Sequence, residues 1–139
     1  MPDQRRPLLR LGVTLLLVSA AFGLAAAIPL PNPARWMVAH VTAIMMGTLT
    51  MAQGLAWRDL RLSDGQRRWL VRCIYISVWA GVVFGTAAAL MDIPGPASSP
   101  GVEPDTQQVA VIAVLLSIII PTTVASWALL FVGLRGDEA

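Results

Sequence analysis

The sequence predicts an all-α integral membrane protein, a four-helix bundle forming one transmembrane domain over residues 1–139, with both termini cytoplasmic. Apolar residues make up 56% of the chain and charged residues 13%, and the mean hydropathy is +0.68. Four apolar runs are long enough to cross a bilayer, and the arginines gather on one side of them. This composition leaves too few charges to cover a soluble domain, so the surplus apolar surface is expected to face lipid.

The four spans follow from the lengths of the apolar runs. A bilayer core about 30 Å thick needs roughly 20 residues of helix. The runs predict helices at residues 8–28, 36–57, 69–91 and 109–134. Ser63 or Asp64 is expected to cap the third helix. Residues 92–108 hold four prolines and two glycines, so they are expected to form an external loop.

The orientation follows from the arginines, because cytoplasmic loops near membrane spans collect positive charge. Nine of the ten arginines lie on one side: before or in the first turn of the first span, between the second and third spans or in the first turn of the third, or after the fourth. The other side holds only Arg35, together with Asp92, Glu103 and Asp105. We therefore expect a multi-pass protein of the cytoplasmic (inner) membrane, in contact with the lipid bilayer.

Three tryptophans fall near the predicted ends of the spans: Trp36, Trp57 and Trp69. Indole rings concentrate at the interface between the bilayer and water. We therefore expect these three rings to form part of an aromatic belt.

A cleaved signal peptide is the alternative interpretation of the first span. Arg5, Arg6 and Arg10 precede an apolar run that ends in three alanines at positions 25–27. Cleavage there would leave three spanning helices and move one terminus outside.

Several function classes are excluded by composition. The only cysteine, Cys73, rules out an intramolecular disulfide and any cysteine-based zinc or iron–sulfur site. The absence of lysine and a net charge of +2 give no nucleic-acid footprint, so no nucleic-acid partner is expected. No Asp or Glu lies inside a predicted span, which argues against proton-coupled transport.

His40 is the candidate functional residue, because an ionisable side chain inside the membrane is energetically expensive. Five residues beyond Arg35 on the second helix, it should lie about 7 Å below the external boundary. Ala43, Ile44 and Gly47 fall close to its face. Their small size would admit either a neighbouring helix or a planar cofactor. His40 is thus a hydrogen-bonded helix–helix contact or a metal ligand.

If His40 binds a metal, haem is the carrier that needs only one protein ligand. Arg35 and the indole N–H of Trp36 are the donors available to its propionates. An open sixth position would give Lewis-acid chemistry. A sixth ligand such as Met37, Met45 or the His40 of a second chain would instead give electron transfer.

A series of short motifs carries a family resemblance: Asn32-Pro33, His40, Met45-Met46-Gly47, Gly54-Leu55-Ala56-Trp57, Leu60-Arg61-Leu62-Ser63, Trp79-Ala80 and Gly133-Leu134-Arg135-Gly136. With these motifs the chain resembles the small four-helix membrane isomerases that include hydroxylaminobenzene mutase and, more distantly, styrene oxide isomerase. Length and helix number agree as well, so the resemblance covers nearly the whole chain.

The resemblance implies a ferric haem b with His40 as its axial ligand, held in a homo-oligomer, a trimer, at a subunit boundary. It implies a redox-neutral rearrangement of a small lipophilic aromatic substrate with the iron as Lewis acid. The substrate would be an N-hydroxyarylamine converted to an aminophenol, or an epoxide converted to an aldehyde. The alternative is a non-catalytic membrane haem protein, an electron-transfer or haem-carrying subunit.

The expected substrate pocket combines the second and third helices: Met45, Met46, Trp79, Gly81 and Gly85. Relatives carry asparagine at the positions of Met46 and Gly81, and the styrene oxide enzymes carry tyrosine at the position of Gly85. Losing those polar groups predicts a roomier and more apolar pocket.

Overall fold

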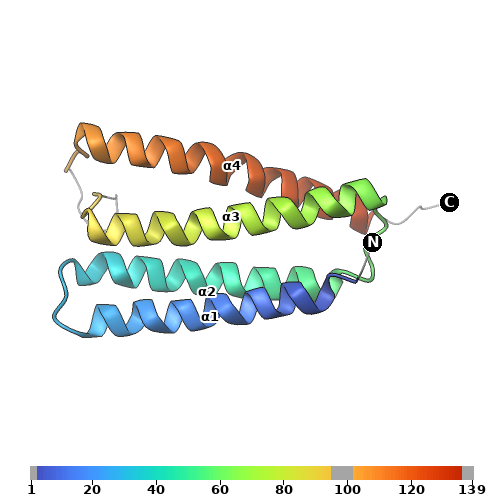
Figure 1. Ribbon diagram of the computed structural model, residues 1–139, viewed down its shortest axis with the longest axis horizontal. Helices are drawn as coiled ribbons and strands as arrows, with labels where there is room; N and C mark the ends of the chain where they lie inside the picture. Colours follow the sequence, from blue (N-terminus) through green and yellow to red (C-terminus); the bar gives the residue numbers. More distant parts are fainter. Residues whose placement is uncertain (1–2, 95–101, 136–139) are drawn as a thin grey trace.

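The protein consists of four long helices, as a computed structural model describes for residues 3–94 and 102–135 (Figure 1). All four helices are long and apolar enough to cross a membrane, and the described residues include no strand. The helices are α1 (Arg5–Ala27), α2 (Pro33–Ala56), α3 (Asp64–Leu90) and α4 (Thr106–Leu134). The predicted all-α membrane fold is therefore confirmed.

Each helix begins three or five residues before the apolar run that predicted it. Two helices begin at capping boxes. In each, the side chain of the cap residue accepts a hydrogen bond from a backbone N–H of the first turn, and a glutamine side chain accepts one from the backbone N–H of the cap residue. Ser63 Oγ accepts from the Gln66 backbone N–H at 3.3 Å, and Gln66 Oε1 accepts from the Ser63 N–H at 2.9 Å. Asp105 and Gln108 cap α4 in the same way. The expected cap at Ser63 is confirmed.

The helices pack in chain order, so within the described ranges each helix backbone lies close only to those of its sequence neighbours (Figure 1). Both described chain ends lie with the α2–α3 connection at one end of the molecule, which we call the arginine-rich end (residues 3–10, 57–72 and 135). The α1–α2 connection, the end of α3 and the start of α4 lie at the opposite end (Figure 1). Which compartment the arginine-rich end faces stays a prediction.

Glycines bring α1 and α2 into close contact. A Cβ added at Gly12 would lie 2.8 Å from the Gly47 carbonyl oxygen. One added at Gly47 would lie 3.0 Å from the Gly12 oxygen. Because a Cβ at either position would crowd the backbone of the other helix, these glycines allow the two helices to approach closely. The small-residue stripe on α2 therefore packs against a neighbouring helix.

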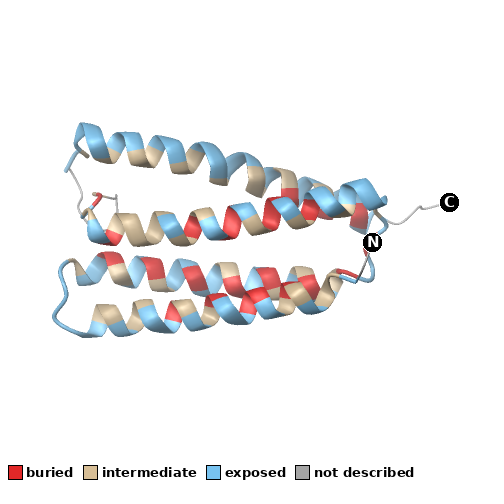
Figure 2. Cartoon of the chain, in the orientation of Figure 1, coloured by how far each residue is buried: buried red, intermediate tan, exposed pale blue. Residues whose placement is uncertain are grey.

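The main apolar core lies toward the arginine-rich end (Figure 2). It is built from buried side chains of α1, α3, α4 and the α2–α3 connection: Leu8, Leu11, Leu15, Trp57, Leu60, Leu70, Ile74, Val78 and Leu130. Three of these leucines belong to α1, which is an integral part of the core. A signal-peptide interpretation would remove that part.

Trp57 corrects the expectation of an aromatic belt. Its ring is 2% exposed, and the Arg67 guanidinium lies 5.5 Å from the ring centroid. Arg67 also donates to the Leu60 and Leu62 carbonyl oxygens, at 2.6 and 3.2 Å. Trp57 therefore packs inward under the α2–α3 connection, whereas Trp69 is 61% exposed.

The opposite end is held by polar contacts between connections. Asn32 Nδ2 donates to the Ala89 carbonyl oxygen at 3.2 Å, and Gln108 Nε2 donates to that of Met91 at 2.9 Å. Arg35 Nε lies 3.4 Å from Asp92 Oδ1. Of the expected external loop, residues 95–101 lie outside the described residues.

Candidate functional site

His40 and Ser19 are joined by hydrogen bonds in both directions across the α1–α2 interface. His40 Nδ1 lies 2.7 Å from the Ser19 carbonyl oxygen. Ser19 Oγ donates to the His40 carbonyl oxygen at 3.1 Å and lies 3.0 Å from Nδ1. Since a carbonyl oxygen only accepts, the His40–Ser19 contact requires the proton on Nδ1. Ser19, which is 1% exposed, thereby fixes both the tautomer and the direction of the ring.

The second ring nitrogen of His40 is unused. Nε2 makes no hydrogen bond to any residue in the described ranges, and the protomer does not enclose it. In a neutral imidazole protonated at Nδ1, Nε2 carries the free lone pair. Metal-binding histidines characteristically donate their other ring N–H to a carbonyl or carboxylate. This geometry leaves Nε2 as the ring nitrogen that is available to a ligand.

Gly23 makes room for this ring. It lies one helical turn beyond Ser19 on α1, and a Cβ there would lie 2.9 Å from His40 Nδ1. Sequence reasoning missed both Ser19 and Gly23. The available signal was their four-residue spacing in α1, which puts two small residues on one helix face.

The two interpretations of His40 left open by the sequence are compatible. The helix–helix hydrogen bond is present through Nδ1, and Nε2 stays available for a ligand. Trp36 and Ile44 lie one turn before and after His40, so they share its side of α2. Trp36 is partly buried, its Nε1 donates to the Pro31 oxygen at 3.1 Å, and Ile44 is 38% exposed.

Two other residues expected to contact the cofactor are buried in the protomer. Ala43 is 3% exposed. Gly47 is covered by the α1 backbone at Gly12, which leaves no space for a macrocycle there.

Arg35 lies away from His40. It is 7% exposed and paired with Asp92, at the end of α3. Five residues on a helix correspond to a rotation of about 140°, so Arg35 and His40 point to different sides of α2. The structure therefore separates the expected propionate partner from the expected iron ligand.

Three of the expected pocket residues do meet, at the α2–α3 interface. A Cβ added at Gly81 would lie 2.7 Å from Met46 Cε, and one at Gly85 would lie 3.2 Å from Ala39 Cβ. The cavity between them is about 10 Å³, roughly the space of one water molecule. In the protomer the Met46 side chain fills the space over Gly81, and a pocket roomier than that of relatives stays a prediction.

The other two expected pocket residues face outward. Met45 is 59% exposed and Trp79 is 44% exposed. Neither lines the small cavity beside Met46.

His40 is not part of a larger group of metal-ligating side chains in the part of the chain that the structure describes. Within residues 3–94 and 102–135, no three His, Cys, Asp or Glu side chains gather into a metal site. Of the groups considered from sequence, haem is the one whose donor requirement a single imidazole meets.

Fold and site together define a class: a four-helix membrane-spanning protein that presents one oriented imidazole from its first helix pair. Comparison with known families makes the identity more specific. The sequence model of styrene oxide isomerase matches residues 4–135, and the chain belongs to the styrene oxide isomerase family. No curated protein and no solved structure matches it. At the level of the family, membership implies an isomerase; the likeness to hydroxylaminobenzene mutase stays a prediction.

Proposed function

We propose that the protein is a haem-dependent isomerase of the cytoplasmic membrane that rearranges a small lipophilic aromatic substrate. The observation that carries the proposal is the geometry of His40, with Nδ1 held by the Ser19 carbonyl and Nε2 free. Family membership supports the isomerase class. The candidate substrates are an aryl epoxide, giving an aldehyde, and an N-hydroxyarylamine, giving an aminophenol.

The residues around His40 fit a haem that binds on the outer surface of the protomer. Nε2 would be the axial ligand of a ferric haem b, and Trp36 and Ile44 would contact the macrocycle from the same side of α2. The cavity beside Met46 is far too small for a macrocycle. We therefore propose that a second copy of the chain covers the group, in a homo-oligomer, with a trimer as the expected assembly.

The chemistry proposed requires no acid or base from the membrane interior. The described spans hold no carboxylate beyond Asp64, at the first residue of α3. Bound there, ferric haem supplies a Lewis acid for the substrate oxygen. The chain itself orients the imidazole through Ser19, and its apolar helices exclude water that would otherwise hydrolyse an activated epoxide.

The proposal is tested on full-length protein purified after expression with ample haem. We expect a Soret band with high-spin ferric features that an added amine perturbs, and conversion of styrene oxide or phenylhydroxylamine to the isomeric product. His40→Ala should lose the Soret band and the activity yet keep its helicity and its elution as an oligomer. Val41→Ala, on the next and half-exposed residue, is the matched control and should behave as wild type.

Full haem occupancy in His40→Ala would contradict the proposal. A low-spin spectrum with no turnover of either substrate would identify a non-catalytic haem protein instead.

A further inference from the structure

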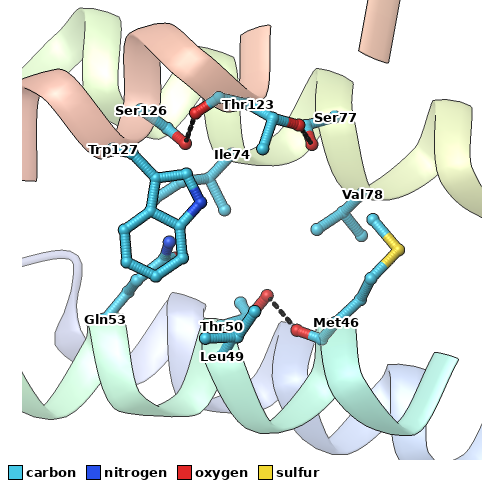
Figure 3. Close-up of a pocket in the computed structure, with 10 residues that line it drawn as sticks. All are labelled: Met46, Leu49, Thr50, Gln53, Ile74, Ser77, Val78, Thr123, Ser126 and Trp127. Atoms are coloured by element: carbon cyan, nitrogen blue, oxygen red, sulfur yellow. Dashed lines mark hydrogen bonds between the residues drawn. The ribbon is translucent and has the colours of Figure 1, made fainter. Parts of the chain in front are cut away.

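A second site lies between α2, α3 and α4, away from His40 (Figure 3). It is a pocket of about 90 Å³. Its walls carry five hydroxyl or amide side chains: Thr50, Gln53, Ser77, Thr123 and Ser126. Such a density of polar groups is unusual at membrane depth, where each needs a partner.

Four of these polar side chains are already hydrogen-bonded inside the protein. Thr50 Oγ1 donates to the Met46 carbonyl oxygen at 2.7 Å, and Ser126 Oγ donates to that of Thr123 at 2.8 Å. The Ser77 and Thr123 hydroxyls share a hydrogen bond of 2.7 Å. These bonds leave Gln53 as the exception.

The Gln53 carboxamide makes no hydrogen bond to any residue that the structure describes. Figure 3 shows its side chain reaching toward the ring of Trp127 across the pocket mouth. A carboxamide offers two donors and an acceptor, and leaving them unpaired in an apolar medium is costly. The Gln53 carboxamide is therefore available to hydrogen-bond a guest in the pocket.

An apolar groove leads to this pocket. It has a volume of about 280 Å³ and lies between α2 and α4, whose backbones do not pack together. Leu49, Gln53 and Trp127 line both spaces, so the pocket and the groove are continuous. Apart from Gln53 and the indole of Trp127, the groove is lined by aliphatic, alanine and phenylalanine side chains. A guest would thus enter sideways from the bilayer.

The shape and the chemistry define the guest. No charged side chain lines either space, which favours a neutral molecule. Engineered protein cavities of about 150 Å³ hold one benzene ring, so a ring spread over pocket and groove fits in size. Met46 closes the pocket on the side of the small cavity over Gly81, which separates this site from the α2–α3 cavity.

We propose that the Gln53 pocket binds a small, neutral, single-ring molecule with one hydroxyl or amide head, such as a phenol. The head bonds to the Gln53 carboxamide and the ring lies in the groove beside Trp127. The site is distinct from His40 and does not depend on haem.

The test uses full-length protein in zwitterionic lipid nanodiscs and two probes of the same shape, 4-bromophenol and 4-bromotoluene. Bromine quenches tryptophan fluorescence on contact, and a specific site gives a saturable component. We expect 4-bromophenol to give this component and Trp127→Phe to remove it. Gln53→Leu should weaken 4-bromophenol about tenfold and leave 4-bromotoluene unchanged. Gln107→Leu, an exposed glutamine at the start of α4, is the matched control.

A second variant keeps the test independent of Gln53. Ala56→Phe fills the groove without changing the carboxamide, and it should weaken both probes. Circular dichroism checks that each variant is folded. Quenching that rises linearly, and equally in Trp127→Phe, would overturn the proposal. Equal loss of both probes in Gln53→Leu would also overturn it.

Discussion

His40 Nδ1 lies 2.7 Å from the Ser19 carbonyl oxygen, and Ser19 Oγ returns a hydrogen bond to the His40 carbonyl oxygen at 3.1 Å. The imidazole is therefore oriented by another helix rather than by its own. Any change in how α1 sits on α2 should alter the direction of Nε2. This coupling between helix packing and ligand geometry is the basis of the first two predictions.

Gly23→Ala should weaken haem binding although Gly23 would not touch the iron. The new Cβ would lie 2.9 Å from His40 Nδ1, so the ring must turn away from Ser19. Changes to groups that orient a metal ligand typically cost roughly 10- to 100-fold in affinity. Transfer of haem to an apo-globin, followed at the Soret band, measures the effect. Unchanged transfer would show that the ring direction does not matter.

Ser19→Ala should have a smaller effect. It removes the hydroxyl, but the backbone carbonyl that accepts from Nδ1 stays. The loss of one neutral hydrogen bond corresponds to about 1 kcal/mol, or roughly fivefold in haem affinity. The same haem-transfer assay should therefore rank wild type above Ser19→Ala and Ser19→Ala above Gly23→Ala. The reverse order would mean that the Ser19 hydroxyl, and not its carbonyl oxygen, orients the His40 ring.

Gly12→Ala should destabilise the fold. The added methyl group would lie 2.8 Å from the Gly47 carbonyl oxygen, a backbone atom that can yield only if the helices separate. Overpacking of this kind costs about 1–3 kcal/mol.

Gly65→Ala is the matched control for Gly12→Ala, because nothing lies within 4 Å of the position of its Cβ. Removing a helical glycine there should stabilise the protein slightly, by about 0.5 kcal/mol. Unfolding by a denaturing detergent, followed by circular dichroism, measures both variants. Equal stabilities would mean that α1 and α2 are not in close contact in the membrane.

The fold was predictable because lipid imposes a simple length rule on apolar runs. The helix starts were not, since hydropathy marks the part of a helix inside the bilayer while hydrogen bonding continues into the charged flanks, as in α3 from Asp64 to Trp69. Capping chemistry at Ser63 did indicate that start. Burial of Trp57 could not be predicted, because it depends on Arg67 folding back over the ring.

The candidate site was predictable only in part, for a different reason. His40 could be identified because an ionisable side chain inside the membrane is costly. The sequence of a stripe of small residues, however, is the same whether a helix or a cofactor packs against it. Gly47 received α1. Gln53 went unnoticed, because an amide carries no charge and its importance appears only once α4 brings Trp127 opposite.

Arg35→Ala should lower the stability more than Asp92→Asn, because it also removes a buried side chain, and both should leave haem binding unchanged. Their side chains are 3.4 Å apart, with Arg35 7% and Asp92 62% exposed, so the pair is worth about 1 kcal/mol. In a double-mutant cycle the two losses should not add, because either change breaks the same contact. Release of haem by Arg35→Ala alone would instead assign Arg35 to a propionate.

Met46→Asn should raise isomerase turnover. In the present chain the Met46 side chain fills the space over Gly81, where a Cβ would lie 2.7 Å from Met46 Cε. Asparagine is shorter, so it should open the cavity of about 10 Å³, and it introduces the amide that the family resemblance implies at this position. One neutral hydrogen bond to the substrate oxygen in the transition state is worth about 1 kcal/mol, a roughly fivefold gain in kcat/KM for styrene oxide.

Met46→Ala opens the same space without a polar group and is the control. No gain is expected from it, because size alone supplies no hydrogen bond. If both variants gain equally, Met46 limits access to the site, and the polar contact plays no part in the rate.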